Sequence, residues 1–165
     1  MNFKNFINSK KAFTFMELIV VLGITAIMIA TSVPVYGSFQ VKLHLLDSSA
    51  DIVQTLRTAR QNAIVGLNNS AHGVFFDINN EVDSFILYQG ESYELRDVAY
   101  DQEFVLKRSL SINNSSFDLV GLDIDINFAK GGLGVPNNIG SLILTHSVIG
   151  SKTISVGEYG KVEKN

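Results

Sequence analysis

Hydrophobic and polar positions divide this chain into an N-terminal helical part and a C-terminal β part. Residues 18–33 are almost wholly apolar, and no charged side chain occurs from Leu18 to Val41. Such a run is long enough to cross a bilayer core of roughly 30 Å at about 1.5 Å of rise per helical residue. The pattern therefore predicts a transmembrane helix.

After this run the pattern becomes that of an amphipathic helix. Apolar or small residues recur at alternating spacings of four and three, which is typical of a helix that lies on a sheet. The stripe consists of Leu45, Ser49, Ile52, Leu56, Ala59 and Ala63. Gly66, followed by Asn68 and Asn69, indicates a helix stop and a turn. We therefore expect one long helix from Phe13 to Val65.

Beyond Gly66 the sequence has the features of β-strands. Short segments rich in β-branched and aromatic residues are separated by Asn, Gly and Asp turns. The expected strands are residues 72–78, 84–89, 103–110, 122–128, 140–146 and 152–156. This spacing predicts a pair of antiparallel sheets. The expected fold class is α+β: a long N-terminal helix, its hydrophobic half protruding, packed on an antiparallel β-sheet or sandwich.

Composition narrows the class of protein. A chain of 165 residues holds one domain with an N-terminal extension. It has no cysteine, which excludes disulfides and thiolate metal sites. Lys4, Lys10 and Lys11 all precede the first acidic residue, Glu17. By the positive-inside rule these lysines predict a cytoplasmic N-terminus, with the rest of the chain on the far side of the membrane.

Glu17 is the residue that needs an explanation, because it stands at the head of the apolar run. A carboxylate inside a membrane costs roughly 2.5–3.5 kcal/mol on insertion scales. Cleavage after Ala12 would create an amino group on Phe13, about one helical turn from Glu17, and the two charges could be buried as a pair. The alternatives are a plain signal anchor or a signal peptide cut near residues 30–32, and both leave Glu17 unexplained.

The segment KAFTFMELIVVLGI, residues 11–24, resembles the class III signal of type IV prepilins and type II secretion pseudopilins. The resemblance implies cleavage between Ala12 and Phe13 by a prepilin peptidase and methylation of Phe13. It also implies that Glu17 sets register by pairing with the terminal amine of a neighbouring subunit, and that Pro34 kinks the helix. Ala12 departs from the glycine that is usual before the cut.

On this resemblance the chain divides into a leader peptide (residues 1–12), a hydrophobic transmembrane or filament-core helix (13–35), an amphipathic second half of the helix (36–66) and a β-rich head (67–165). LRTARQNAIV and KTISVGEYGKVEKN are more weakly similar to parts of the H-type pseudopilins and FimT-like minor pilins. In that family the last hairpin places a basic residue after a glycine, here Gly160 and Lys161.

The resemblance implies a minor pilin or pseudopilin of a type II secretion pseudopilus or a type IV pilus, assembled through its N-terminal helix. Its partners would be other pilin-like subunits, the prepilin peptidase and the inner-membrane assembly platform. It would cross the inner membrane once, with its head outside the cytoplasm, and then enter the filament. Two alternatives stay open: a DNA-uptake minor pilin whose head binds DNA, and a signal-anchored β domain that never polymerises. Removing residues 1–12 leaves 10 basic against 16 acidic residues, a net charge of −6 that disfavours general nucleic-acid affinity.

Asp123, Asp125 and Asn127 are weak candidates for a metal site. They alternate with apolar residues, and three oxygen-bearing side chains on one strand face would suit calcium. The same alternation is typical of a strand with one wet and one buried face, and no EF-hand spacing is present. We therefore expect no metal and no other cofactor.

No arrangement of residues predicts catalysis. Gly131, Gly132 and Gly134 predict a loop, since no Lys-Ser or Lys-Thr pair follows them as in a phosphate-binding loop. The three histidines, His44, His72 and His146, have neither metal-ligand spacing nor a triad pattern. The sequence thus predicts a protein that is not an enzyme.

Overall fold

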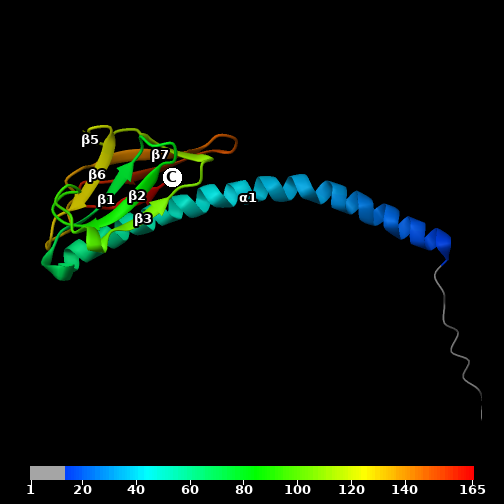
Figure 1. Cartoon of the computed structure of the whole chain (residues 1–165), viewed down its shortest axis with the longest axis horizontal. Coiled ribbons are helices and arrows are strands. Elements are labelled where there is room, and N and C mark those ends of the chain that lie inside the picture. The colour runs from blue at the N-terminus through cyan, green and yellow to red at the C-terminus, as the bar shows by residue number, and fades with distance from the viewer. Residues whose placement is uncertain (1–13) are drawn as a thin grey trace, which may run out of the picture. The chain divides into compact units, whose positions relative to one another are not determined.

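The computed structural model describes residues 14–165, apart from the side chains of residues 32–36 and 38. The predicted leader peptide, residues 1–12, and the predicted cleavage residues Ala12 and Phe13 lie outside the described residues. The chain groups into two compact units that divide between Gln40 and Val41. Helix α1 (Phe15–Val65) runs through both, and every strand belongs to the second, which we call the globular unit (residues 41–165) (Figure 1).

The part of helix α1 from Val41 to Val65 packs one side against the core of the globular unit. All six residues of the predicted stripe, from Leu45 to Ala63, are buried there, whereas Asp47 and Asp51 are exposed. The helix ends at Val65, and Gly66 adopts a left-handed conformation with φ of 66°. Because such a conformation strains residues that carry a Cβ, glycine is the natural stop signal here. The predicted amphipathic helix and its end are confirmed.

Two antiparallel sheets complete the globular unit, as predicted. The five-stranded sheet has the order β3 (Gln102–Val105), β2 (Ser84–Gln89), β1 (His72–Asp77), β6 (Asp123–Phe128) and β5 (Leu119–Val120). The four-stranded sheet has the order β4 (Leu110–Asn114), β7 (Gly140–His146), β8 (Gly150–Val156) and β9 (Val162–Lys164). Two short 3₁₀ turns, η1 (Leu67–Asn69) and η2 (Val98–Tyr100), lie in connecting segments.

One hydrophobic core joins the helix and both sheets. Ile52 and Leu56 of α1 share it with Val74 and Phe76 of β1 and with Leu144 of β7. Because side chains alternate along a strand, Gly73, Phe75 and Asp77 lie on the opposite face of β1. This second face of the five-stranded sheet, which we call the outer face, carries a set of polar side chains described below.

One predicted strand, residues 103–110, is wrong. The structure splits it between β3 in one sheet and β4 in the other, with a turn at Lys107 whose carbonyl accepts a hydrogen bond from the Leu110 amide. The crossing is held by Asp83, whose carboxylate accepts a hydrogen bond from the Ile112 amide. The turn contains no Gly, Pro or Asn, so its sequence gives no signal that one strand ends and another begins there. The short strands β5 and β9 were also missed.

Candidate functional site

The N-terminus of α1 is capped by Thr14. The Thr14 hydroxyl accepts a hydrogen bond of 3.2 Å from the Glu17 amide, and its carbonyl accepts one of 3.2 Å from the Leu18 amide. Thr-x-x-Glu is the sequence of a capping box, in which the hydroxyl satisfies an amide that the helix leaves unpaired. Glu17 therefore occupies the first helical turn, where the helix dipole favours a negative charge. Its carboxylate is exposed and forms no ion pair with another described residue.

The helical surface that follows Glu17 is apolar on every side. The nine large side chains between Leu18 and Ile29 are 48–67% exposed. Successive helical residues point about 100° apart, so the unbroken run from Leu18 to Leu22 covers the full circumference. A helix that packs one stripe against a core would show exposed polar residues on its other side. This surface therefore lacks the polar face that an amphipathic helix presents to solvent.

The two hydroxyl side chains in this segment bond within the helix itself. Thr25 donates a hydrogen bond of 2.7 Å to the Val21 carbonyl, and Thr31 donates to the carbonyls of Ile27 and Met28 at 3.2 and 3.1 Å. A hydroxyl that is satisfied by its own helix needs no water, which makes it tolerable in an apolar environment.

Other sequence predictions for this segment stay untested. Pro34 lies within α1, but its side chain is outside the described set, so the predicted kink remains a prediction. Among the described residues, no helix is both long enough and apolar enough to cross a membrane.

On the outer face of the five-stranded sheet, Tyr88 and Asp125 form a buried hydrogen bond. The Tyr88 hydroxyl donates to Asp125 Oδ1 at 2.6 Å and accepts from Asn127 Nδ2 at 3.0 Å. The ring lies over Gly73, where a Cβ would collide with it. Burial, more than the adjacent carboxylate, raises the pKa of Tyr88, so its hydroxyl stays a donor. Burial also raises the pKa of Asp125, against the lowering effect of its hydrogen bonds from Tyr88 and Tyr93.

The segment between β2 and β3 crosses this outer face and is fixed to it by aromatic stacking. Tyr93 stacks on Phe75 with ring centroids 3.7 Å apart, and the Arg96 guanidinium lies 3.8 Å above the Tyr93 ring. Arg96 also pairs with Asp101 at 2.8 Å. The Tyr93 amide donates a longer hydrogen bond, 3.4 Å, to Asp125. These contacts cover Asp125, which is 6% exposed.

The weak metal candidates Asp123 and Asp125 are both occupied by protein donors. Asp123 Oδ1 accepts from the Ile78 amide at 3.1 Å and from Asn79 Nδ2 at 2.6 Å. Asp125 accepts from Tyr88 and Tyr93, as described above. Among the described residues, no three His, Asp or Glu side chains are grouped as they would be to hold an ion. The two carboxylates act as hydrogen-bond acceptors that join β6 to neighbouring segments.

The other sequence candidates do not form a site. Gly131, Gly132 and Gly134 have φ of 72°, 63° and 60° and form a loop, which confirms that prediction. The histidines lie on different elements, His44 on α1, His72 on β1 and His146 on β7. Burial lowers the pKa of His72.

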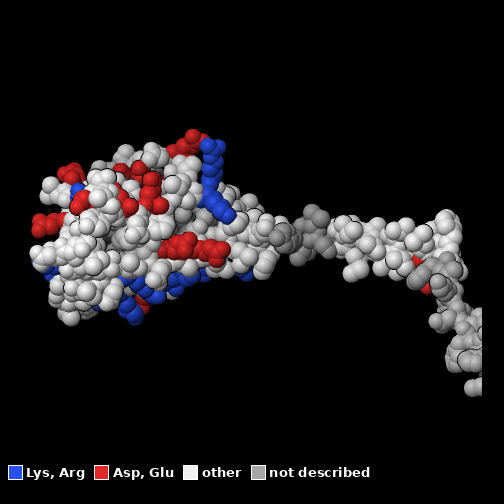
Figure 2. Space-filling view, turned by 60° about the horizontal axis from the view of Figure 1, so that its bottom comes forward, with Lys and Arg blue, Asp and Glu red and all other residues white. Residues whose placement is uncertain are grey.

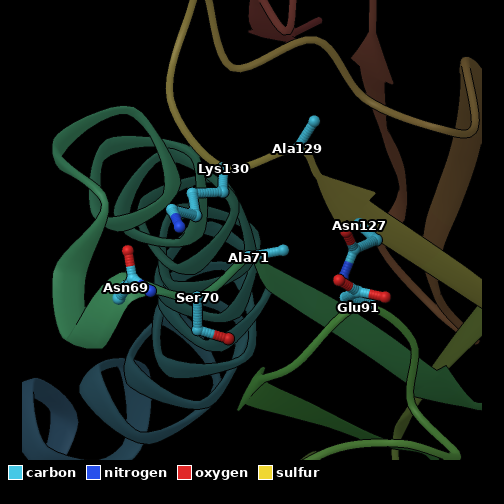
Figure 3. Close-up of a pocket in the computed structure, with 7 residues that line it drawn as sticks. All are labelled: Asn69, Ser70, Ala71, Glu91, Asn127, Ala129 and Lys130. Carbon is cyan, nitrogen blue, oxygen red and sulfur yellow. The ribbon is translucent and has the colours of Figure 1, made fainter.

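A polar groove lies beside the C-terminal end of α1. It has a volume of about 360 Å³ and is lined by Asn69, Ser70, Ala71, Glu91, Asn127, Ala129 and Lys130. Figure 3 shows Lys130 and Asn69 on one side of the groove and Glu91 and Asn127 on the other. The groove offers one charge of each sign and several amides, but it does not place a nucleophile beside a base.

A second groove of about 350 Å³ lies between α1 and the segment before β9. It is lined by Arg57, Arg60, Gln61, Gly160, Lys161 and Val162, and we call it the basic groove. Arg57 Nη2 donates to the Val162 carbonyl at 3.1 Å, and Arg60 Nη2 donates to the Leu133 carbonyl at 3.0 Å. A Cβ at Gly160 would lie 2.6 Å from Arg60 Nε, so glycine is required for this close approach.

Comparison with known protein families, with curated proteins and with solved structures finds no match for this chain.

Sequence reasoning missed three features. The capping box at Thr14 was visible as Thr-x-x-Glu, a short local signal. The Tyr88–Asp125 pair depends on strand register, and the basic groove joins Arg57 to Lys161 across about a hundred intervening residues. No local pattern identifies either of these before the strands are placed.

Proposed function

We propose that this chain is a pilin-like filament subunit, a minor pilin or pseudopilin of a type II secretion pseudopilus or a type IV pilus. The observation that carries the proposal is the apolar helical surface from Leu18 to Thr31. It is uncharged and exposed on all sides, and its hydroxyls are satisfied internally. The N-terminal sequence around Glu17 supplies the specific resemblance to the pilin superfamily.

This surface requires an apolar partner on energetic grounds. Full burial of a Val, Leu, Ile or Met side chain contributes roughly 1.5–3 kcal/mol. Nine such side chains are each about half exposed, so burying them fully would contribute on the order of 10 kcal/mol that the helix does not gain in water. That amount is comparable to the whole stability of a typical domain, about 5–15 kcal/mol. A lipid bilayer, and later the helices of neighbouring subunits, would each provide the missing environment.

In the proposed mechanism the hydrophobic half of α1 holds the subunit in the inner membrane, with the N-terminus in the cytoplasm and the globular unit outside it. A prepilin peptidase cleaves between Ala12 and Phe13 and methylates Phe13. The assembly platform then extracts the subunit, and its helix enters the bundle of the filament. The exposed carboxylate of Glu17 is available to pair with the terminal ammonium of a neighbour.

The test compares Glu17→Ala with the matched control Asp47→Ala, which removes an exposed carboxylate from the second half of α1. Wild-type chain and both variants are expressed in a host with an assembly machine, and the mass of each N-terminus is measured. We expect all three to begin at Phe13 and to accumulate in the membrane. Only Glu17→Ala should be depleted from sheared filaments, by about tenfold or more, because its neighbour's charge would be buried alone.

Two results would refute the proposal. A mature chain that still begins at Met1, or that begins beyond Val33, excludes processing of the pilin type. Absence of wild type and Glu17→Ala alike from sheared filaments indicates a signal-anchored domain that does not polymerise.

A further inference from the structure

Acidic residues concentrate in the segment that follows β2 and runs into the first two residues of β3. Residues 91–103, which we call the acidic segment, contain five carboxylates and the single cation Arg96. Asp101 pairs with Arg96, and Asp97 accepts a hydrogen bond from the Ala99 amide. The remaining three, Glu91, Glu94 and Glu103, are exposed and form no ion pair with other described residues.

The basic groove carries an excess of positive charge. Arg57 and Arg60 both donate to backbone carbonyls, and neither pairs with a carboxylate among the described residues. Lys161 pairs with Glu163 at 2.5 Å, but its side chain remains 78% exposed. In Figure 2, Lys and Arg side chains gather along the lower edge of the globular unit, and most of the Asp and Glu side chains in view lie away from that edge.

The two surfaces belong to different faces of the globular unit. The acidic segment is fixed to the outer face of the five-stranded sheet by the stacking of Tyr93 on Phe75. The basic groove lies where α1 meets the segment before β9, at the edge of the other sheet. One copy therefore presents a positive surface and a negative surface on separate elements. Contacts of this head-to-tail kind repeat from copy to copy and build rings or filaments.

We propose that the basic groove receives the acidic segment of a second copy of this chain. Arg57 and Lys161 face the incoming carboxylates, and Arg60 has the additional role of joining α1 to the loop at Leu133. A volume of about 350 Å³ accommodates one or two acidic side chains. Complementary charge gives such a contact its orientation more than its strength, which suits subunits placed side by side. The inference rests on the proposed function only in that a filament brings copies together.

The test uses cross-linking, because the natural chain has no cysteine. Full-length Gln61→Cys and Ser92→Cys variants, which keep every charge of the groove and of the acidic segment, carry tags of different size and are mixed in non-ionic detergent micelles and oxidised gently. The matched control replaces Gln61→Cys by Lys152→Cys, at a lysine of β8 that does not line the groove. We expect the mixed disulfide dimer to exceed the control by about tenfold at low salt and to decline towards it at high salt, where the Debye length falls to a few ångströms.

Charge reversal decides whether the groove directs the contact. Arg57→Glu on the Gln61→Cys copy should lower the mixed dimer by about tenfold, and Glu91→Lys on the Ser92→Cys copy should restore much of it. Near-UV circular dichroism checks that each variant is folded. A yield equal to the Lys152→Cys control, or unchanged by Arg57→Glu, overturns the proposal.

Nucleic acid is the rival occupant of the groove. If the full chain binds a fluorescent DNA oligonucleotide in a salt-sensitive way, and Arg57→Glu abolishes that binding without affecting the cross-link, the groove is a phosphate site and the proposal is overturned. Because this experiment needs no filament, it also separates the two proposals. Cross-linking in micelles together with absence of the wild-type chain from sheared filaments would preserve the contact between copies and refute the pilin-like function.

Discussion

Replacing Gly73 by alanine should displace Tyr88 from the outer face of the five-stranded sheet. A Cβ at this position would lie 2.5 Å from Tyr88 Cζ and 2.8 Å from Cε1, and closer still to the hydroxyl oxygen. The ring has no space to yield, because Tyr88 is 1% exposed and its hydroxyl is bonded to Asp125 and Asn127. The substitution therefore tests whether the strand requires glycine for the sake of one neighbouring ring.

The expected cost follows from the contacts that would be lost. Overpacking a core costs about 1–3 kcal/mol, and leaving the buried Asp125 carboxylate without its donor costs about 1–3 kcal/mol more. Alanine regains about 0.5–1 kcal/mol relative to glycine in a strand. Gly73→Ala should therefore destabilise the globular unit by about 1–5.5 kcal/mol. Tyr88→Ala alone should cost about 3–5 kcal/mol.

A double-mutant cycle measures the coupling between these two positions. Once Tyr88 is alanine, the three atoms nearest to the added Cβ are gone, so Gly73→Ala should then cost nothing or stabilise slightly. The free energy of unfolding is obtained by urea denaturation of the full chain in non-ionic detergent, followed by near-UV circular dichroism. Gly157→Ala, whose Cβ would meet only one atom at 3.9 Å, serves as the control and should change stability by less than about 0.5 kcal/mol. If the two single costs add to within about 0.5 kcal/mol, the steric explanation is wrong.

Three further outcomes are expected. Burial raises the pKa of Asp125 above its value in the unfolded chain, so the native state holds this proton more tightly. Stability should therefore fall as pH rises from the unfolded pKa through the folded pKa of Asp125. Asp125→Asn should flatten this fall in thermal unfolding measured from pH 3.5 to 7. Thr14→Ala should remove the cap of α1, worth about 0.5–2 kcal/mol, and speed hydrogen exchange at the Glu17 amide. Gly160→Ala should destabilise by about 2–4 kcal/mol in the same urea assay, because its φ of 69° strains alanine and its Cβ meets Arg60.

The parts of the fold that depend on local periodicity were predictable. The stripe from Leu45 to Ala63 repeats with the period of a helix, and Gly66 carries the conformation that ends one. The switch between sheets after Val105 was not predictable, because Leu106 and Leu110 are both buried and the intervening residues look like a continued strand. Two long-range hydrogen bonds to Asp83 separate the two strands. The Asp83 carbonyl accepts one from the amide of Leu106, which follows β3, and the Asp83 carboxylate accepts the other from the amide of Ile112 in β4.

The candidate site was predictable only where it is contiguous in sequence. The apolar run and Glu17 stand next to each other, so their conflict is visible without a structure. Asp125 was noticed only as a weak candidate for a cation ligand, and its hydrogen bonds from Tyr88 and Tyr93 were not foreseen. That partnership follows from register, which pairs Gly73 with Tyr88 and Phe75 with Asp125. Register is set by the burial of whole strands, so no short motif encodes it.

The capping box at Thr14 changes the argument about Glu17 without removing it. A carboxylate in the first turn of a helix gains about 0.3–1 kcal/mol from the helix dipole, whereas its insertion into a membrane costs roughly 2.5–3.5 kcal/mol. The favourable position therefore offsets at most about 40% of that cost, and about 1.5–3 kcal/mol remains. The cap also uses the Glu17 amide and leaves the carboxylate exposed. The helix dipole accounts for why an acid is tolerated at this position, and in a chain inserted and processed as proposed above the terminal ammonium of a neighbour would offset the remaining cost.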